Sequence, residues 1–220
     1  MNTSASPGSG KLPILAVLIT ALAAGIGLYA GQRFFAPTEL PAMENSLLYP
    51  QARELPPFSL TADDGREFTQ TDLRGRWSLV FIGFTQCPDI CPTTLADLSK
   101  ARKQMEDLPE AQRPQIVFVS VDPERDSPVQ AGEYARYFDP AARAASADHE
   151  RLQPFTRSLG MVYMQSPLEG GGYTVDHSAS VAIIDPEGRQ IGLVRPPLDP
   201  ARIARDLRAL MAHRARQTAG

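Results

Sequence analysis

The chain has 220 residues, of which 43% are apolar and 21% charged, and its formal net charge at pH 7 is −3. These values are typical of a globular chain with one or two domains. Its Lys and Arg residues form no basic cluster, so the composition argues against a nucleic-acid-binding protein.

The first informative segment is N-terminal. Residues 12–30 contain no charged residue, and at ~1.5 Å per residue a helix of this length would reach roughly 28 Å, about one hydrocarbon core. A cleaved signal peptide is the alternative, with a cleavage site at residues 21–23, but signal h-regions usually end after ~7–15 residues. Both interpretations place the rest of the chain outside the cytoplasm. We predict a tail over residues 1–11, a transmembrane helix over 12–30, a linker over 31–50 and one domain over 51–220.

The domain opens with a predicted β-hairpin, formed by residues 57–60 and 67–69 around a turn signal. Strands of the fully buried type follow at 77–85 and 116–121, and the run between them has helical spacing. A strand, a helix and a strand in this order predict a right-handed unit with parallel strands. The remaining predictions are helices over 128–138, within 149–159 and after Pro200, and strands over 161–165, 178–185 and 190–194.

The chain's two cysteines, Cys87 and Cys91, lie between the first buried strand and the following helix. Pro92 disfavours a helical conformation at Cys91 and itself suits the first helical position. We therefore expect a tight turn over residues 88–91, with Cys91 at the helix N-cap, where the helix dipole favours a thiolate. A disulfide across so short a loop would stabilise the fold very little, which leaves redox chemistry or metal binding as the role of the pair.

The order of elements predicts a thioredoxin-like α/β fold, with a mixed central sheet flanked by helices. Ligand sites in open α/β sheets lie beyond the carboxyl ends of the parallel strands, which is where the cysteine turn falls. His177 directly precedes the late strand predicted over 178–185, which would start at the same edge. The topology therefore brings His177 toward Cys87 and Cys91.

Two thiolates and one imidazole suit copper or zinc. A closed structural zinc site takes four protein ligands, and the sequence offers no obvious fourth. Three ligands leave a position for a partner, which suits a metal that is handed on. On spacing alone, a strand-edge His177 without a metal is the simpler alternative. We expect His149 and His213 to be solvated helix residues.

Acidic residues accompany the candidate site. Asp176 either orients His177 or is an ordinary turn residue. Asp122, Glu124 and Asp126 either steer a cationic partner or cap and solvate the helix that follows them, and we favour the second interpretation.

Residues 83–95 (GFTQCPDICPTTL) closely resemble the signature of the Sco/SenC family. Residues 121–128 (VDPERDSP) and 175–178 (VDHS) resemble two further stretches of that family, and the resemblance covers roughly residues 55–210. It implies a membrane-anchored, thioredoxin-like copper-binding protein in which Cys87, Cys91 and His177 are the copper ligands. Phe84 stands where the family pattern has tyrosine, and residues 140–155 look divergent.

The resemblance implies a copper metallochaperone that assists assembly of the copper centre of cytochrome c oxidase. Its implied partners are the copper-centre subunit of the oxidase and, beyond it, other copper chaperones or thiol reductants. The implied location is the inner membrane, with a single span and the domain on the periplasmic side. The alternatives are a thiol–disulfide oxidoreductase that reduces the cysteines of the oxidase site, a redox sensor, and a peroxidase.

Overall fold

The computed structural model describes residues 11–35 and 41–218, and the chain divides into two compact units between Leu40 and Pro41. The first unit contains the helix α1 (Lys11–Phe35). Its segment Ile14–Gly31 has a mean hydropathy of 2.2, so α1 is long and apolar enough to cross a membrane. The helix predicted over residues 12–30 is thus present.

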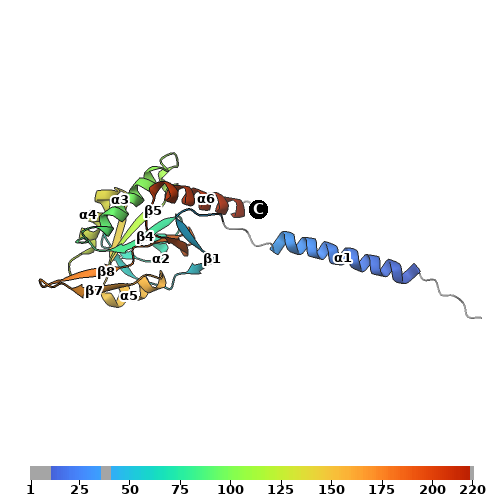
Figure 1. The fold of residues 1–220 in the computed structure, drawn as a ribbon, viewed down its shortest axis with the longest axis horizontal. Coiled ribbons are helices and arrows are strands. Elements are labelled where there is room, and N and C mark those ends of the chain that lie inside the picture. The colour runs from blue at the N-terminus through green and yellow to red at the C-terminus, as the bar shows by residue number, and fades with distance from the viewer. Residues whose placement is uncertain (1–10, 36–40, 219–220) are drawn as a thin grey trace, which may run out of the picture. The chain divides into compact units, whose positions relative to one another are not determined.

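The second unit is built around a mixed sheet with helices packed against it (Figure 1). The sheet has eight strands in the order β1-β10-β9-β4-β5-β6-β2-β3. Its strands are β1 (Ser46–Glu54), β2 (Leu60–Ala62), β3 (Glu67–Phe68), β4 (Ser78–Gly83), β5 (Gln115–Ser120), β6 (Arg143–Ser146), β9 (Val181–Ile184) and β10 (Arg189–Val194). A separate two-stranded sheet pairs β7 (Tyr163–Pro167) with β8 (Tyr173–His177). The helical elements are α2 (Gln70–Leu73), α3 (Ile90–Lys103), η1 (Glu110–Gln112), α4 (Pro128–Phe138), α5 (His149–Ser158) and α6 (Pro200–Thr218).

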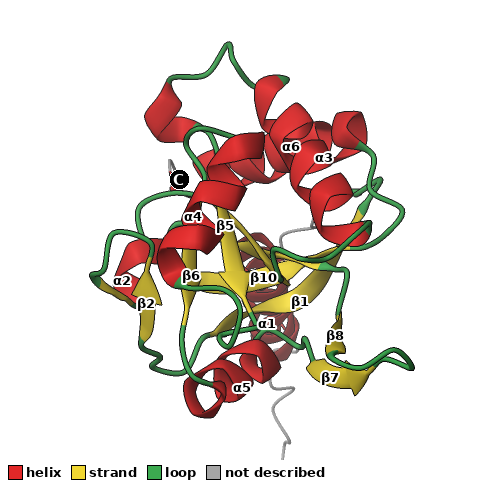
Figure 2. Cartoon of the chain, turned by 90° about the vertical axis from the view of Figure 1, so that its left-hand side faces the viewer, coloured by secondary structure: helices red, strands yellow, loops and turns green. Residues whose placement is uncertain are grey.

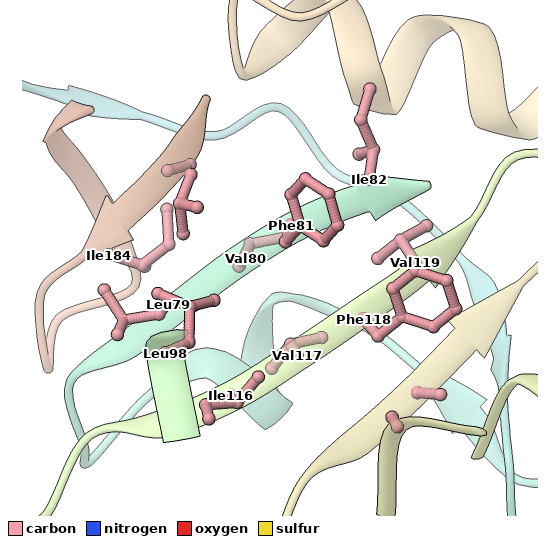
Figure 3. Close-up of a cluster of buried hydrophobic side chains, with 14 of the residues drawn as sticks. Leu79, Val80, Phe81, Ile82, Leu98, Ile116, Val117, Phe118, Val119 and Ile184 are labelled. Atoms are coloured by element: carbon pink, nitrogen blue, oxygen red, sulfur yellow. The ribbon is translucent and has the colours of Figure 1, made fainter. Parts of the chain in front are cut away.

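The core lies around β4 and β5, in which every residue is buried. The two strands pair in parallel and are connected through α3, as the order of elements predicted. Figure 3 shows their apolar side chains next to Leu98 of α3. In Figure 2, α3, α4 and α6 lie on one side of the sheet and α5 on the other, while the β7–β8 hairpin stands apart from the sheet. The mixed α/β fold is the one predicted from the sequence.

Two strands of the sheet were not predicted. β1 pairs antiparallel with β10, and its residues 46–50 fall within the predicted linker. β6 pairs in parallel with β5. The sequence of β1 lacks the alternation of a half-buried strand, and β6 is a short segment that contains two alanines, which are depleted in strands. Their pairing depends on the tertiary fold, so local pattern does not reveal it.

Helix ends were predicted well where a side chain caps them. Ser127 accepts a hydrogen bond from the backbone N–H of Gln130, whose side-chain oxygen accepts from the backbone N–H of Ser127. This reciprocal cap begins α4 at Pro128, as expected. α5 is followed by Gly160, whose positive φ of 71° is favoured by glycine.

Candidate metal centre

The cysteine turn connects the buried end of β4 to the start of α3. The helix begins at Ile90 with Asp89 as its N-cap, so the predicted N-cap at Cys91 is wrong. Pro92 is tolerated inside the first turn because the first N–H groups of a helix have no intrahelical acceptor. Cys87 therefore lies on the turn and Cys91 in the first turn of the helix.

The two thiols have different surroundings. Cys91 is fully buried, whereas Cys87 is half-buried. Burial raises the pKa of the Cys91 thiol far above its usual range, so the expectation of a thiolate-favouring Cys91 is wrong. The backbone N–H of Cys91 instead donates to Cys87 Sγ at 3.4 Å, so a free N–H at the helix start points toward the Cys87 sulfur.

Gly83, the last residue of β4, leaves the space that the Cys91 sulfur occupies. A Cβ atom added at Gly83 would lie 2.6 Å from Cys91 Sγ and 3.0 Å from the ring of Phe118. Real Cβ contacts are not this short, and both neighbours belong to the buried core. A side chain at position 83 would therefore displace the thiol.

His177 is the last residue of β8, in the separate hairpin. The predicted late strand starts only at Val181, so His177 does not directly precede it. His177 Nε2 nevertheless lies 3.3 Å from Cys91 Sγ, and the two residues are brought together as predicted. Its ring meets the rings of Phe81 and Phe84 edge-on, at centroid distances of 5.7 and 6.0 Å.

The protonation of the His177 ring follows from its hydrogen bond to the backbone. Nδ1 lies 3.1 Å from the carbonyl oxygen of Ser178, which can only accept, so Nδ1 carries the proton. Burial lowers the pKa of His177, which favours the neutral ring. In that ring Nε2 keeps its lone pair and directs it toward the Cys91 thiol.

The ligand atoms of Cys87, Cys91 and His177 all lie within 4.8 Å of one another. Among the described residues, this is the group of three or more His, Cys, Asp or Glu side chains close enough to hold a metal ion. Two sulfur donors and an imidazole lone pair are a donor set for copper or zinc.

Asp122 and Asp126 are buried, contrary to the prediction that they solvate a helix start. Asp126 accepts hydrogen bonds from the backbone N–H of Thr85 at 2.7 Å, from Thr85 Oγ1 at 2.5 Å and from Ser120 Oγ at 2.6 Å. Asp122 accepts from the hydroxyl of Tyr173 at 2.7 Å. Neither side chain is available to steer a partner or to solvate a helix, because both are buried. Of the three acidic residues, Glu124 alone is exposed.

The other proposed neighbours of the site also differ from expectation. Asp176 is exposed and accepts from Ser166 Oγ, and the Ser178 carbonyl bonds the His177 ring in its place. His213 is buried, so its prediction as a solvated residue is wrong. His149 is half-buried, with Nδ1 2.8 Å from the Tyr163 hydroxyl and Nε2 2.9 Å from Glu124. Spacing alone could not reveal these partners, because they come from other elements.

A mixed sheet with two thiols and an imidazole beyond the carboxyl end of a central strand defines a thioredoxin-like protein with a candidate metal site. The SCO1/SenC family model matches residues 48–212, and the chain belongs to this family. A protein of Stutzerimonas stutzeri is 36% identical over 156 residues, which cover 70% of this chain and 75% of the relative. The mitochondrial SCO1 homolog 1 of Arabidopsis thaliana is 38% identical over 133 residues. That match spans 60% of this chain but only 39% of the relative's length.

Solved structures of the family share the fold. Arabidopsis thaliana ScoI with copper bound is 32% identical, with a TM-score of 0.67 over 72% of this chain and 98% of that structure. Bradyrhizobium japonicum ScoI with copper bound is 34% identical, with a TM-score of 0.63 over 70% of this chain and 98% of that structure. The thioredoxin-like fold expected from the family resemblance is thereby confirmed.

Proposed function

We propose that this chain is a copper metallochaperone that binds one copper ion through Cys87, Cys91 and His177 and assists assembly of the copper centre of cytochrome c oxidase. The observation that carries the proposal is the approach of His177 Nε2 to within 3.3 Å of Cys91 Sγ, with the partly exposed Cys87 close by. Family membership and the two copper-bound relatives support copper over zinc.

The three side chains can bind copper when both thiols are deprotonated and the imidazole is neutral. Copper takes thiolates, so the buried Cys91 thiol must lose the proton that its raised pKa retains. The His177 ring needs no such change, because its Nε2 lone pair is free while the Ser178 carbonyl holds the Nδ1 proton. Cys87 is the more exposed thiol and is therefore the first to meet an incoming ion.

The setting of the site supports delivery of the metal to a partner. We place α1 as a single span of the inner membrane and the second unit on its periplasmic side. A site with three protein ligands leaves a position for a ligand of the receiving protein. We propose the copper-centre subunit of the oxidase as that protein, with other copper chaperones or thiol reductants acting upstream.

Copper titration of the full chain, purified reduced in detergent micelles, tests the proposal. We expect one copper per chain and a thiolate-to-copper absorption band with Cu(II). His177→Ala should weaken Cu(II) binding much more than it changes the potential of the dithiol. His213→Gln, which alters a histidine on α6 outside the cluster, is the matched control and should bind like the wild type. A reduced wild-type chain that binds no copper above background would overturn the proposal.

A second candidate, thiol–disulfide exchange, is favoured by the unequal exposure of the two thiols. The Cys87 thiolate would attack one sulfur of a target disulfide, forming a mixed disulfide and releasing one target thiolate. Cys91, after losing its proton, would then attack Cys87 Sγ and release the second target thiolate. The target gains two electrons, and the pair ends as a Cys87–Cys91 disulfide.

The two candidate functions differ in their need for His177, because thiol–disulfide exchange does not use its ring. If exchange is the function, a model disulfide should be reduced by the wild type and by His177→Ala at similar rates, while Cys87→Ser should be inactive. A chain that binds copper but reduces no model disulfide would exclude the enzyme activity and leave the metallochaperone.

A further inference from the structure

The β7–β8 hairpin, which carries His177, forms its own two-stranded sheet. Its strands pair with each other and with no strand of the main sheet within the described residues. Besides the short connection to β9 and the Ser178 carbonyl, side-chain contacts therefore hold the imidazole at its distance from the thiols. Several of these side chains belong to the β5–α4 loop, residues 121–127.

Arg125 of this loop contacts the hairpin through its guanidinium group. Its guanidinium carbon lies 4.0 Å from the ring centroid of Tyr173, the first residue of β8. Its Nη1 donates to the Tyr173 carbonyl at 3.0 Å. Its Nε donates to Asp122, which also accepts from the Tyr173 hydroxyl. Arg125 thus contacts the ring and the carbonyl of Tyr173, and Asp122, the ion-pair partner of Arg125, accepts from the Tyr173 hydroxyl.

The same guanidinium contacts the cysteine turn. Its carbon lies 5.5 Å from the ring centroid of Phe84, and Nη1 is 3.5 Å from Gln86 Oε1. Gln86 directly precedes Cys87, and the Phe84 ring meets the His177 ring edge-on. Arg125 therefore contacts both structures that supply the donor atoms.

Hydrogen bonding alone does not account for the placement of this side chain. Nη2 of Arg125 is buried and has no hydrogen-bond partner. An ion pair with Asp122 would not require the guanidinium to lie near both the Tyr173 and the Phe84 ring. The planar cation is well suited to that position, because guanidinium stacks on aromatic faces.

We infer that Arg125 is a positioning residue that sets the separation between the His177 imidazole and the two thiols, and so the preference of the site for Cu(II). The inference rests on the proposed copper binding. Imidazole is a good ligand for Cu(II), whereas soft thiolates favour Cu(I). Without the contacts of Arg125, the hairpin should position His177 less precisely. Cu(II) binding should therefore weaken, while the thiols still bind Cu(I).

The test compares Arg125→Lys with the wild type in the full chain in detergent. Lysine keeps the charge but loses the planar fork and the ring stacking. We expect Cu(II) affinity to fall about 10–100-fold, as for other residues that orient a metal ligand. Cu(I) affinity should change less than about 3-fold, and the Cu(II) absorption and EPR spectra should shift.

Arg143→Lys is the matched control. The Arg143 guanidinium also lies over an aromatic ring, Phe68 at 5.2 Å, and bonds a carboxylate, Asp72 at 3.1 Å. Because Phe68 and Asp72 belong to neither the hairpin nor the cysteine turn, both copper affinities should be unchanged.

A double-mutant cycle identifies the route of the effect. If Arg125 acts through His177, Arg125→Lys should have no further effect on Cu(II) in a His177→Ala chain. Undiminished weakening in that background, or equal weakening of Cu(I) and Cu(II), would overturn the inference. A wild type without copper binding would instead overturn the proposed function.

Tyr173→Leu provides a second variant, which removes the ring and the hydroxyl but keeps Arg125. It should show the same selective loss of Cu(II) affinity, and it decides the question if Arg125→Lys does not fold. Wild-type Cu(II) affinity and spectra in a folded Tyr173→Leu chain would overturn the inference.

Discussion

The cysteine turn and the β7–β8 hairpin supply the two kinds of donor in the site, and they are held in different ways. The cysteine turn joins β4, a strand with no exposed residue, to a helix whose first turn buries Cys91. The hairpin has mostly exposed or half-exposed residues and pairs only with itself among the described strands. The core and the backbone therefore fix the thiols, whereas the hairpin that carries the imidazole depends on side-chain contacts and on the Ser178 carbonyl.

On the proposed function, this difference separates the requirements of the two oxidation states of copper. The thiols, which would be ligands in both states, are connected to the buried core. The imidazole, which we propose matters more for Cu(II), depends on the contacts of Tyr173 with the β5–α4 loop. Changes in the hairpin should therefore alter metal preference, and changes at the turn should alter metal binding as a whole.

Hydrogen exchange should show the largest difference between the two regions. Every residue of β4 and β5 is buried, whereas most residues of the two hairpin strands are exposed or half-exposed. We expect hairpin amides to exchange on the order of 100-fold faster or more than those of β4. Exchange measured on the full chain with chelator present checks this. Equal protection of β4 and β8 would contradict the comparison.

Asp126→Asn tests how the turn is fixed. The carboxylate accepts from the backbone N–H and hydroxyl of Thr85 and from Ser120, and an amide has one oxygen acceptor for these three donors. We expect the free energy of unfolding to fall by about 1.5–3 kcal/mol. Urea unfolding measures the change, and Asp107→Asn, at an exposed ion pair with Arg208, should alter it little. Equal effects of the two substitutions would show that Asp126 does not hold the turn.

Gly83→Ala tests how tightly the core fixes the Cys91 thiol. The added Cβ would lie 2.6 Å from Cys91 Sγ, so we expect a loss of about 1–3 kcal/mol in unfolding free energy from overpacking. Both copper affinities should fall, because the proposed site uses the displaced sulfur as a ligand in both oxidation states. Gly170→Ala is the control, since a Cβ there meets no atom within 4 Å. Wild-type stability and copper binding in Gly83→Ala would contradict the prediction.

The pH dependence of stability should show the smallest effect. Burial lowers the pKa of His177 below its ordinary value of 6.5, so the unfolded chain takes up this proton more readily than the folded one. His177 therefore lowers stability as the pH falls below 6.5 and has no such effect above it. In chelator, the urea midpoint of the wild type should fall more steeply below that pH than the midpoint of His177→Gln. Parallel midpoints would show that the ring gains protons equally in both states.

Much of the fold could be predicted because the decisive signals are local. The apolar strands around Phe81 and Phe118 and the capped start of α4 each follow from a short stretch of sequence. β1 and β6 were missed because they are strands only through their partners. His177 could be brought toward the cysteines by topology, but its place at the end of a separate hairpin could not be predicted.

The sequence by itself determined the donor set of the candidate site, because Cys87, Cys91 and His177 are donor types that suit copper or zinc and the order of strands brings them to one edge. Only the tertiary structure decided the state of those donors. Burial, which depends on distant parts of the chain, raises the pKa of Cys91 rather than favouring its thiolate. The Ser178 carbonyl holds the His177 ring with Nε2 toward the thiol, a role that the sequence had offered to Asp176. The contacts of Arg125 with two segments about 40 and 50 residues away likewise exist only in the folded chain.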